Sequence, residues 1–163
     1  MIKYDYVKTR REDIRPIEKK HVGLVRFFMR WATAFNVAVF RMSKGRLLNK
    51  FPGGFPICIV ETRGAKTGKI RRIALIHLPH NDTKLLVASQ GGMYKNPVWY
   101  HNIVANPKIL IMVDGEEKTY RARVVSDEEK AALWPHLVSL YPDFDEYQAR
   151  TDRNIPVFSC ELI

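Results

Sequence analysis

The sequence predicts an α+β fold in which antiparallel strands form a small β-barrel with helices packed outside it. Short apolar runs rich in β-branched residues recur between turn signals, which is typical of strands. One helical segment falls between strands, and two more follow one another before a last strand. Consecutive antiparallel strands with helical inserts favour a barrel over a parallel sheet.

Length and composition indicate one globular domain of ordinary size. The chain has 163 residues, 46% of them hydrophobic and 27% charged. No apolar run approaches the ~20 residues of a membrane span, and the mostly charged stretch Ile2–Lys20 does not resemble a signal peptide. Cys58 and Cys160 lie in apolar, strand-like runs, so we expect buried free thiols and a cytosolic location.

The positive charge is concentrated in the first third of the chain. Residues 1–50 hold 13 Lys and Arg against 4 Asp and Glu, a net of +9 of the total of +10. This distribution argues against a single basic face spread over the fold, and we expect no nucleic acid partner.

The first 50 residues are expected to form an extension distinct from the barrel at 51–163. Residues 1–20 are polar and charged, which predicts poor order or loose packing. Pro16–Lys50 reads as a basic, aromatic-rich amphipathic helix, broken near Asn36. Such a helix either covers one end of the barrel or lies on an anionic membrane surface.

Two predicted strands, Phe55–Val60 and Ile73–Leu78, are joined by the basic turn Thr62–Arg72. Gly64 and Gly68 allow N–H groups to point the same way, and five cations surround them, so the turn suits a phosphate or a carboxylate tail. It is not a P-loop, since three rather than four residues separate its glycines and a strand, not a helix, follows. A solvated hairpin without a ligand remains the alternative.

The next elements in the chain are a strand and a short helix joined by a glycine-rich turn. The turn signal Pro79–Asp82 precedes a strand at Lys84–Ala88, which ends in the second N–H-exposing turn, Ser89–Gly92. Asn96 is the expected N-cap and Pro97 the expected first residue of a helix that ends near Ala105.

The rest of the chain is predicted to form two strands around the hairpin turn Asp114–Gly115, then two helices and a last strand. These elements are Lys108–Val113, Lys118–Val125, a helix opened by the capping box Ser126–Glu129 and containing Pro135, a helix at Pro142–Thr151, and a strand at Pro156–Leu162.

No constellation of protein side chains predicts catalysis by itself. The histidines and cysteines lack the spacing of metal ligands, Ser89 is not in a nucleophile elbow, and no pair of carboxylates marks a site. Any chemistry is therefore expected to come from a bound cofactor. Trp99, Tyr100, Tyr141 and Tyr147 could wall a planar ring, although core packing explains Trp99 equally well.

Six ordered motifs resemble those of the deazaflavin-dependent nitroreductase family of actinobacteria. The resemblance covers about Pro56 to the C-terminus. The motifs are Thr62–Arg72, Ala88–Gly92, Asn96–Asn102, Ala105–Pro107, Ala122–Arg123 and Tyr147–Val157.

This resemblance implies a split β-barrel of the flavin-binding type, with about six antiparallel strands, that binds the deazaflavin coenzyme F420. It implies that the phosphate and glutamate tail of F420 is held by Arg63, Lys66, Thr67, Lys69 and Arg71. The ring and its linker would be lined by Ala74, Leu75, Ile76, Ser89, Gln90, Gly91, Gly92, Trp99 and Asn102. The substrate would face Tyr100, Tyr141 and Tyr147.

In that family the reduced deazaflavin passes a hydride to an enone, a quinone or a nitroaromatic compound. Because no strong protein acid is visible, the hydroxyl of Tyr141 or Tyr147, or water, is the expected proton donor. Ala65 stands where the family often has Arg or Lys, and Thr67 where it often has Ser. A flavin mononucleotide enzyme and a non-catalytic carrier of the cofactor are the alternatives, and five cations are more than one phosphate needs.

Overall fold

The computed structural model describes residues 4–14, 35, 37–40, 42, 43, 47 and 49–163. Its strands are β1 (Lys50–Phe51), β2 (Phe55–Arg63), β3 (Ile70–Ile76), β4 (Leu78–His80), β5 (Thr83–Val87), β6 (Lys108–Val113), β7 (Glu116–Val124) and β8 (Val157–Leu162). Its helices are α2 (Val98–Ala105), α3 (Asp127–Leu140) and α4 (Asp143–Arg150), with 3-10 turns η1 (Arg11–Asp13) and η3 (Gln90–Gly92).

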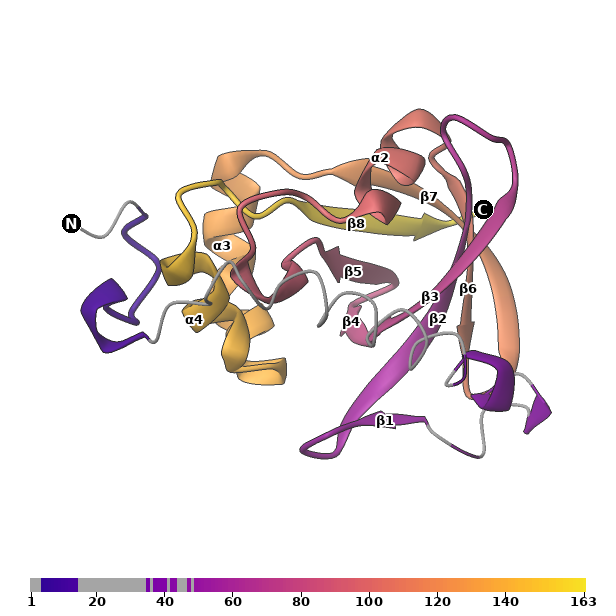
Figure 1. Cartoon of the computed structure of the whole chain (residues 1–163), viewed down its shortest axis with the longest axis horizontal. Coiled ribbons are helices and arrows are strands. Elements are labelled where there is room, and N and C mark those ends of the chain that lie inside the picture. Colours follow the sequence, from indigo (N-terminus) through magenta and orange to yellow (C-terminus); the bar gives the residue numbers. More distant parts are fainter. Residues whose placement is uncertain (1–3, 15–34, 36, 41, 44–46, 48) are drawn as a thin grey trace.

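The strands form one antiparallel sheet that curls into a barrel (Figure 1). The strand order is β3-β2-β6-β7-β8-β5-β4, and β1 pairs with the start of β2. Strands β3 and β4 stand at opposite ends of this order, yet only His77 separates them in the chain. The two edges of the sheet must therefore meet, which confirms the predicted fold class.

Alternate residues of these strands fill the barrel interior. Cys58 and Val60 of β2 and Leu86 of β5 belong to one buried cluster, in which Trp99 and Ile103 of α2 also lie. Helix α2 thus packs over the interior. Cys58 and Cys160 are buried free thiols, as expected, and burial raises the pKa of each to about 12.

Helices α3 and α4 cover the outer face of β4 and β5 (Figure 1). Leu78 and Leu85 pack there with Trp134 and Leu137 of α3 and Phe144 of α4. Helix α3 begins with the predicted capping box, in which Ser126 and Glu129 exchange hydrogen bonds. The apolar side chains that β4 and β5 place on this face are therefore shielded from solvent by α3 and α4.

The N-terminal segment packs more tightly than its composition predicts. Val7 is only 3% exposed and lies in the cluster beneath α3 and α4. The backbone N–H groups of Lys8 and Thr9 donate to Asp145 Oδ2 at 2.9 and 2.6 Å, and the Thr9 hydroxyl donates to the same oxygen at 2.7 Å. The expectation of loose packing is wrong for residues 4–9, because one buried carboxylate supplies the acceptor that this segment lacks.

Replacing Asp145 by alanine is expected to lower the free energy of unfolding by about 3 kcal/mol, because three donors of the N-terminal segment and the Trp134 indole lose a charged acceptor. Urea denaturation followed by tryptophan fluorescence measures this change. Glu116→Ala, which removes an exposed ion pair with Lys118, is the matched control and should leave the free energy of unfolding close to the wild-type value. Equal losses in the two variants would contradict the assignment.

The predicted amphipathic helix is described only in part. Residues 37–40 are helical, and Val37 and Phe40 are buried against Ile57 and Ile59 on the outer face of β2. The rest of the prediction for Pro16–Lys50, including a break near Asn36, lies outside the described residues. The helices that the structure does describe are all too short or too polar to cross a bilayer.

Two local predictions are wrong in detail. Pro79 lies inside β4 rather than in a turn, which is tolerated because β4 is an edge strand paired only with β5. The turn follows at Asn81, whose φ is 49°. Helix α2 has Pro97 as its N-cap and Val98 as its first residue, because the Asn96 side chain accepts a hydrogen bond from Arg153 instead of capping the helix.

Candidate functional site

The turn between β2 and β3, residues 63–70, is an ordered tip. The Gly64 N–H donates to the Lys69 carbonyl at 2.8 Å, and the Gly68 N–H donates to the Gly64 carbonyl at 2.8 Å. Gly68 has a φ of 65°, and a Cβ on Gly64 would lie 2.8 Å from the Thr67 hydroxyl oxygen. Both glycines are therefore required by the shape of the turn.

Helix α2 fixes this tip in place, and Figure 1 shows the two side by side. Asn102 Oδ1 accepts a hydrogen bond from the Ala65 N–H at 3.0 Å, and Asn102 Nδ2 donates to the Thr62 hydroxyl at 3.4 Å. Asn106 Nδ2 donates to the Arg63 carbonyl at 3.3 Å. The buried Asn102, predicted to line the ring or its linker, uses both ends of its amide to hold the tip.

Four cations on and beside the tip are available to a ligand. Arg63, Lys66, Lys69 and Arg71 are all exposed, and none forms an ion pair with another described residue. The fifth cation of the predicted turn, Arg72, lies in β3 and is bound to Glu61 at 2.6 Å. A rigid backbone that carries four unpaired positive charges suits a ligand with more than one negative charge.

The second glycine-rich turn, Ser89–Gly92, lies against α4. A Cβ on Gly92 would lie 2.7 Å from the backbone carbonyl oxygen of Tyr147, so only glycine allows this approach. Arg150 Nη1 donates to the Gly91 carbonyl at 2.9 Å. The side-chain oxygen of Gln90 is buried and has no partner among the described residues, so it can accept a hydrogen bond from a bound ring.

The Tyr147 backbone packs against Gly92 of this turn, and the Tyr147 side chain meets that of Tyr141. Their hydroxyl oxygens are 3.2 Å apart. Tyr141 is only 3% exposed and packs on Phe55 and Phe144, so its ring lies in apolar surroundings. Burial raises the pKa of both tyrosines, and their mutual hydrogen bond raises the pKa of Tyr141 further while it lowers that of Tyr147. Both hydroxyls therefore keep their protons at neutral pH.

Helix α2 joins the two turns. At its C-terminal end, Asn102 and Asn106 hold the basic tip through hydrogen bonds. At its N-terminal end, Val98 is connected to the glycine-rich turn Ser89–Gly92 by residues 93–97. A helix of this length measures about 12 Å, so the two turns flank a span that suits a long ligand rather than a single small ion.

The remaining predicted site residues do not share one surface. Leu75 faces the barrel interior, whereas Ala74 packs toward Val37 and Phe40 on the outer face, and Ile76 packs in the cluster beneath α3. Trp99 is buried against Phe158, and the half-buried Tyr100 packs on the same ring. Core packing thus accounts for Trp99. The side chains of residues 74–76 point to different clusters, so a ligand could contact all three residues only through the backbone of β3.

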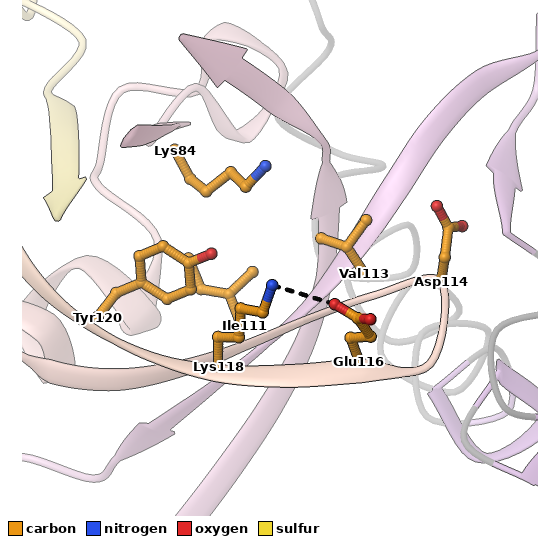
Figure 2. Close-up of a pocket in the computed structure, with 7 residues that line it drawn as sticks. All are labelled: Lys84, Ile111, Val113, Asp114, Glu116, Lys118 and Tyr120. Atoms are coloured by element: carbon orange, nitrogen blue, oxygen red, sulfur yellow. Dashed lines mark ion pairs between the residues drawn. The ribbon is translucent and has the colours of Figure 1, made fainter. Parts of the chain in front are cut away.

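A hollow of about 350 Å³ lies at the opposite end of β6 from α2 (Figure 2). Of the described residues that line it, none belongs to the predicted site. Its two lysines are balanced by two carboxylates, and Lys118 Nζ lies 3.1 Å from Glu116 Oε2. The lining residues are Lys84, Ile111, Val113, Asp114, Glu116, Lys118 and Tyr120.

Metal chemistry finds no support in the described residues, where no group of three or more His, Cys, Asp and Glu side chains could hold an ion. The basic tip has the charge and order that suit the anionic part of a cofactor, and the buried oxygen of Gln90 in the glycine-rich turn suits a hydrogen-bond donor of its ring.

Comparison with known proteins identifies the cofactor. The model of the F420H(2)-dependent quinone reductase family matches residues 32–161. The chain belongs to this family. The reductase is 37% identical to an F420H(2)-dependent quinone reductase of Mycobacterium tuberculosis over 123 residues, which are 74% of this chain and 83% of the relative. Coenzyme F420 is thus the cofactor of the reductase, and the resemblance to deazaflavin-dependent enzymes is confirmed.

Solved structures agree with this assignment. An F420-H2 dependent reductase, FDR-A, superposes on the reductase with a TM-score of 0.61 and 40% identity, over 65% of this chain and 94% of that chain. The haem storage protein HutZ of Vibrio cholerae superposes with a TM-score of 0.53 at 10% identity over 66% of this chain and 81% of that chain, which shows the shared fold alone. The reductase is therefore an oxidoreductase built on a split barrel.

Two residues of the site were missed by the sequence-based prediction. Arg150 and Arg153 lie inside the quoted motif Tyr147–Val157, but no role was assigned to either. Both reach backbone carbonyls of the segment from Ala88 to Met93. The motif was the only feature of the sequence that pointed to these two arginines. Their hydrogen-bond partners lie about 60 positions earlier in the chain, and the residues next to an arginine do not indicate so distant a partner.

Proposed function

We propose that the reductase transfers a hydride from reduced F420 to quinones and to other electron-poor conjugated acceptors, including enones and nitroaromatic compounds. The observation that carries the proposal is the hydrogen-bonded pair of tyrosine hydroxyls on the α3–α4 side of the molecule, where the backbone of Tyr147 packs against Gly92 of the Ser89–Gly92 turn. The turn is the seat that we propose for the deazaflavin ring, so a proton donor stands beside the place where the acceptor must lie.

Each part of the site has a separate task in this proposal. Arg63, Lys66, Lys69 and Arg71 bind the phosphate and glutamate tail, and the Thr67 hydroxyl helps to shape the tip by accepting from the Lys69 N–H at 3.4 Å. When bound, the reduced deazaflavin supplies two electrons and one hydrogen as hydride. Tyr147 would then give a proton to the reduced acceptor, and the hydrogen bond between the Tyr141 and Tyr147 hydroxyls would hold the Tyr147 hydroxyl in place.

Mixing the purified protein with reduced F420 and a water-soluble benzoquinone, a nitroaromatic compound or a cyclic enone tests this function. The absorbance of oxidised deazaflavin should return only when both protein and acceptor are present. Saturable binding of reduced F420 without turnover of any acceptor would favour a carrier. Flavin mononucleotide that remains bound through purification would favour a flavin enzyme instead.

We propose further that the chain around the partly described helix binds an anionic membrane surface, which would bring the site to lipid-soluble quinones. Val37 and Phe40 pack inward on β2, whereas Phe35, Met42 and Leu47 are exposed apolar side chains in a basic stretch. Met42 is 86% exposed, so it contributes little to the folded core. Exposed apolar groups among cations are typical of interfacial anchors.

Met42→Glu is expected to reduce sedimentation with vesicles rich in phosphatidylserine about tenfold, because one apolar contact is lost and one negative charge is added. Turnover of a water-soluble quinone should stay the same. Val124→Glu, which changes an exposed apolar residue of β7, is the matched control. Equal sedimentation of wild type and Met42→Glu would show that this surface does not bind membrane.

A further inference from the structure

The turn Ser89–Gly92 has a backbone conformation that requires support. Gln90, Gly91 and Gly92 have φ values of 47°, 64° and 76°, so three consecutive residues lie in the left-handed region. Of the three, Gln90 adds the most conformational strain, since positive φ is disfavoured for a residue with a side chain. The hydrogen bonds of the described residues use the N–H groups of Gly92 and Met93, but not those of Gln90 and Gly91. The turn therefore has two N–H donors that bond to no acceptor in the described part of the chain.

Arg153, in the connection between α4 and β8, holds the carbonyl side of this segment. Its Nη2 donates to the Ala88 and Ser89 carbonyls at 3.0 and 2.7 Å, and its Nε donates to the Met93 carbonyl at 2.7 Å. Its Nη1 donates to Asn96 Oδ1 at 2.7 Å. One guanidinium thus binds four oxygens spread over nine residues that run from the end of β5 to the start of α2.

The base of this arginine is itself fixed. The Arg153 carbonyl accepts a hydrogen bond from Gln148 Nε2 at 2.9 Å, and Gln148 Oε1 accepts from the Ile155 N–H at 2.9 Å and from Lys130 Nζ at 2.7 Å. Gln148 is buried. Burial lowers the pKa of Arg153, but a guanidinium still carries its charge at any physiological pH. The arginine is therefore a charged fork on a rigid support.

We propose that Arg153 is a positioning residue for hydride transfer, which sets the ring-binding turn by drawing its carbonyls to one side. With the carbonyls of Ala88, Ser89 and Met93 bound to the guanidinium, the N–H groups of Gln90 and Gly91 are left for the ligand. A planar fork is needed, because an ammonium group cannot reach four oxygens in this arrangement. The inference rests on the proposed function, in which this turn seats the deazaflavin ring.

The proposal predicts a split between binding and turnover. The four cations of the tip supply most of the affinity and do not contact Arg153, so loss of the guanidinium should leave the dissociation constant for F420 nearly unchanged. A misplaced ring should lower kcat by about 10- to 100-fold, since small errors in position are costly in group transfer. The kcat of Arg153→Lys should be no higher than that of Arg153→Gln, although lysine keeps the positive charge.

The test compares Arg153→Gln and Arg153→Lys with a control variant, Arg123→Gln. Arg123 lies on β7 and is bound to Glu129 of α3 at 2.8 Å. Affinity for F420, kcat with a water-soluble quinone, and amide hydrogen exchange without ligand are measured on each. Faster exchange confined to residues 88–96, together with lower kcat and unchanged affinity, is expected for both Arg153 variants and not for Arg123→Gln. If Arg153→Gln does not fold, Arg153→Lys alone decides the outcome.

Unchanged kcat in a folded Arg153 variant, full rescue by lysine, or wild-type exchange at residues 88–96 would overturn the proposal. Failure of the proposed function looks different. In that case the wild-type protein itself would show no turnover, while the exchange experiment would still report whether Arg153 orders the turn.

Discussion

Replacing Lys66 and Lys69 together by alanine is expected to raise the dissociation constant for reduced F420 about 100-fold, since two charge-assisted contacts at about 1.5 kcal/mol each are lost. The rigid tip should survive, because its hydrogen bonds use backbone groups, the Thr67 hydroxyl and Asn102 rather than the lysine side chains. Fewer cations at the tip should also make the affinity less sensitive to salt. Fluorescence titration of the cofactor at several salt concentrations measures both effects.

The matched control for this double variant is Lys84→Ala with Lys118→Ala. It removes the same charge from the hollow at the opposite end of β6, which is a separate place for a ligand to bind (Figure 2). Affinity should remain at the wild-type value. If the control variant lost affinity and the tip variant kept it, the cofactor site would have to be moved to the hollow.

Tyr147→Phe is expected to lower kcat about 100-fold, within the range found for loss of a general acid. Its affinity for F420 should be unaffected, because the hydroxyl faces the acceptor in our proposal. Tyr141→Phe should cause a smaller loss of about tenfold, because it removes only the hydrogen bond that holds the Tyr147 hydroxyl. Steady-state kinetics with a quinone acceptor measures the two losses.

Tyr120→Phe is the control for these tyrosine variants, since it removes a hydroxyl from the hollow rather than from the predicted site. Its kcat should equal that of the wild type. A solvent deuterium isotope effect on turnover that is the same in wild type and in Tyr147→Phe would contradict proton delivery by Tyr147 and leave water as the donor.

Sequence reasoning found the parts of the site that depend on local chemistry. The basic tip was predictable because Gly64 and Gly68 mark the turn and the cations stand within it. The Ser89–Gly92 turn was predictable for the same reason. Capping of α3 by Ser126 was also local, and it is confirmed.

Contacts between distant parts of the chain were beyond the reach of sequence reasoning. Nothing near Asp145 indicates that its carboxylate binds the backbone of Lys8 and Thr9. Nothing near Arg153 indicates that it binds carbonyls about 60 residues earlier. The apolar packing of Tyr141 depends on Phe55, which only the fold brings to it. In each case one polar or aromatic side chain finds a partner that lies far away in the sequence and is brought near only by the tertiary fold.

The most direct test of the account is a comparison of two ligands: F420 itself and the deazaflavin core without its phosphate and glutamate tail. The dissociation constant of the core should be at least about 100-fold higher for the wild-type protein, because the core cannot use the cations of the tip. For Lys66→Ala with Lys69→Ala the difference between the two ligands should shrink to a small factor. Equal affinity of the wild-type protein for F420 and for the core would contradict the claim that the basic tip holds the tail.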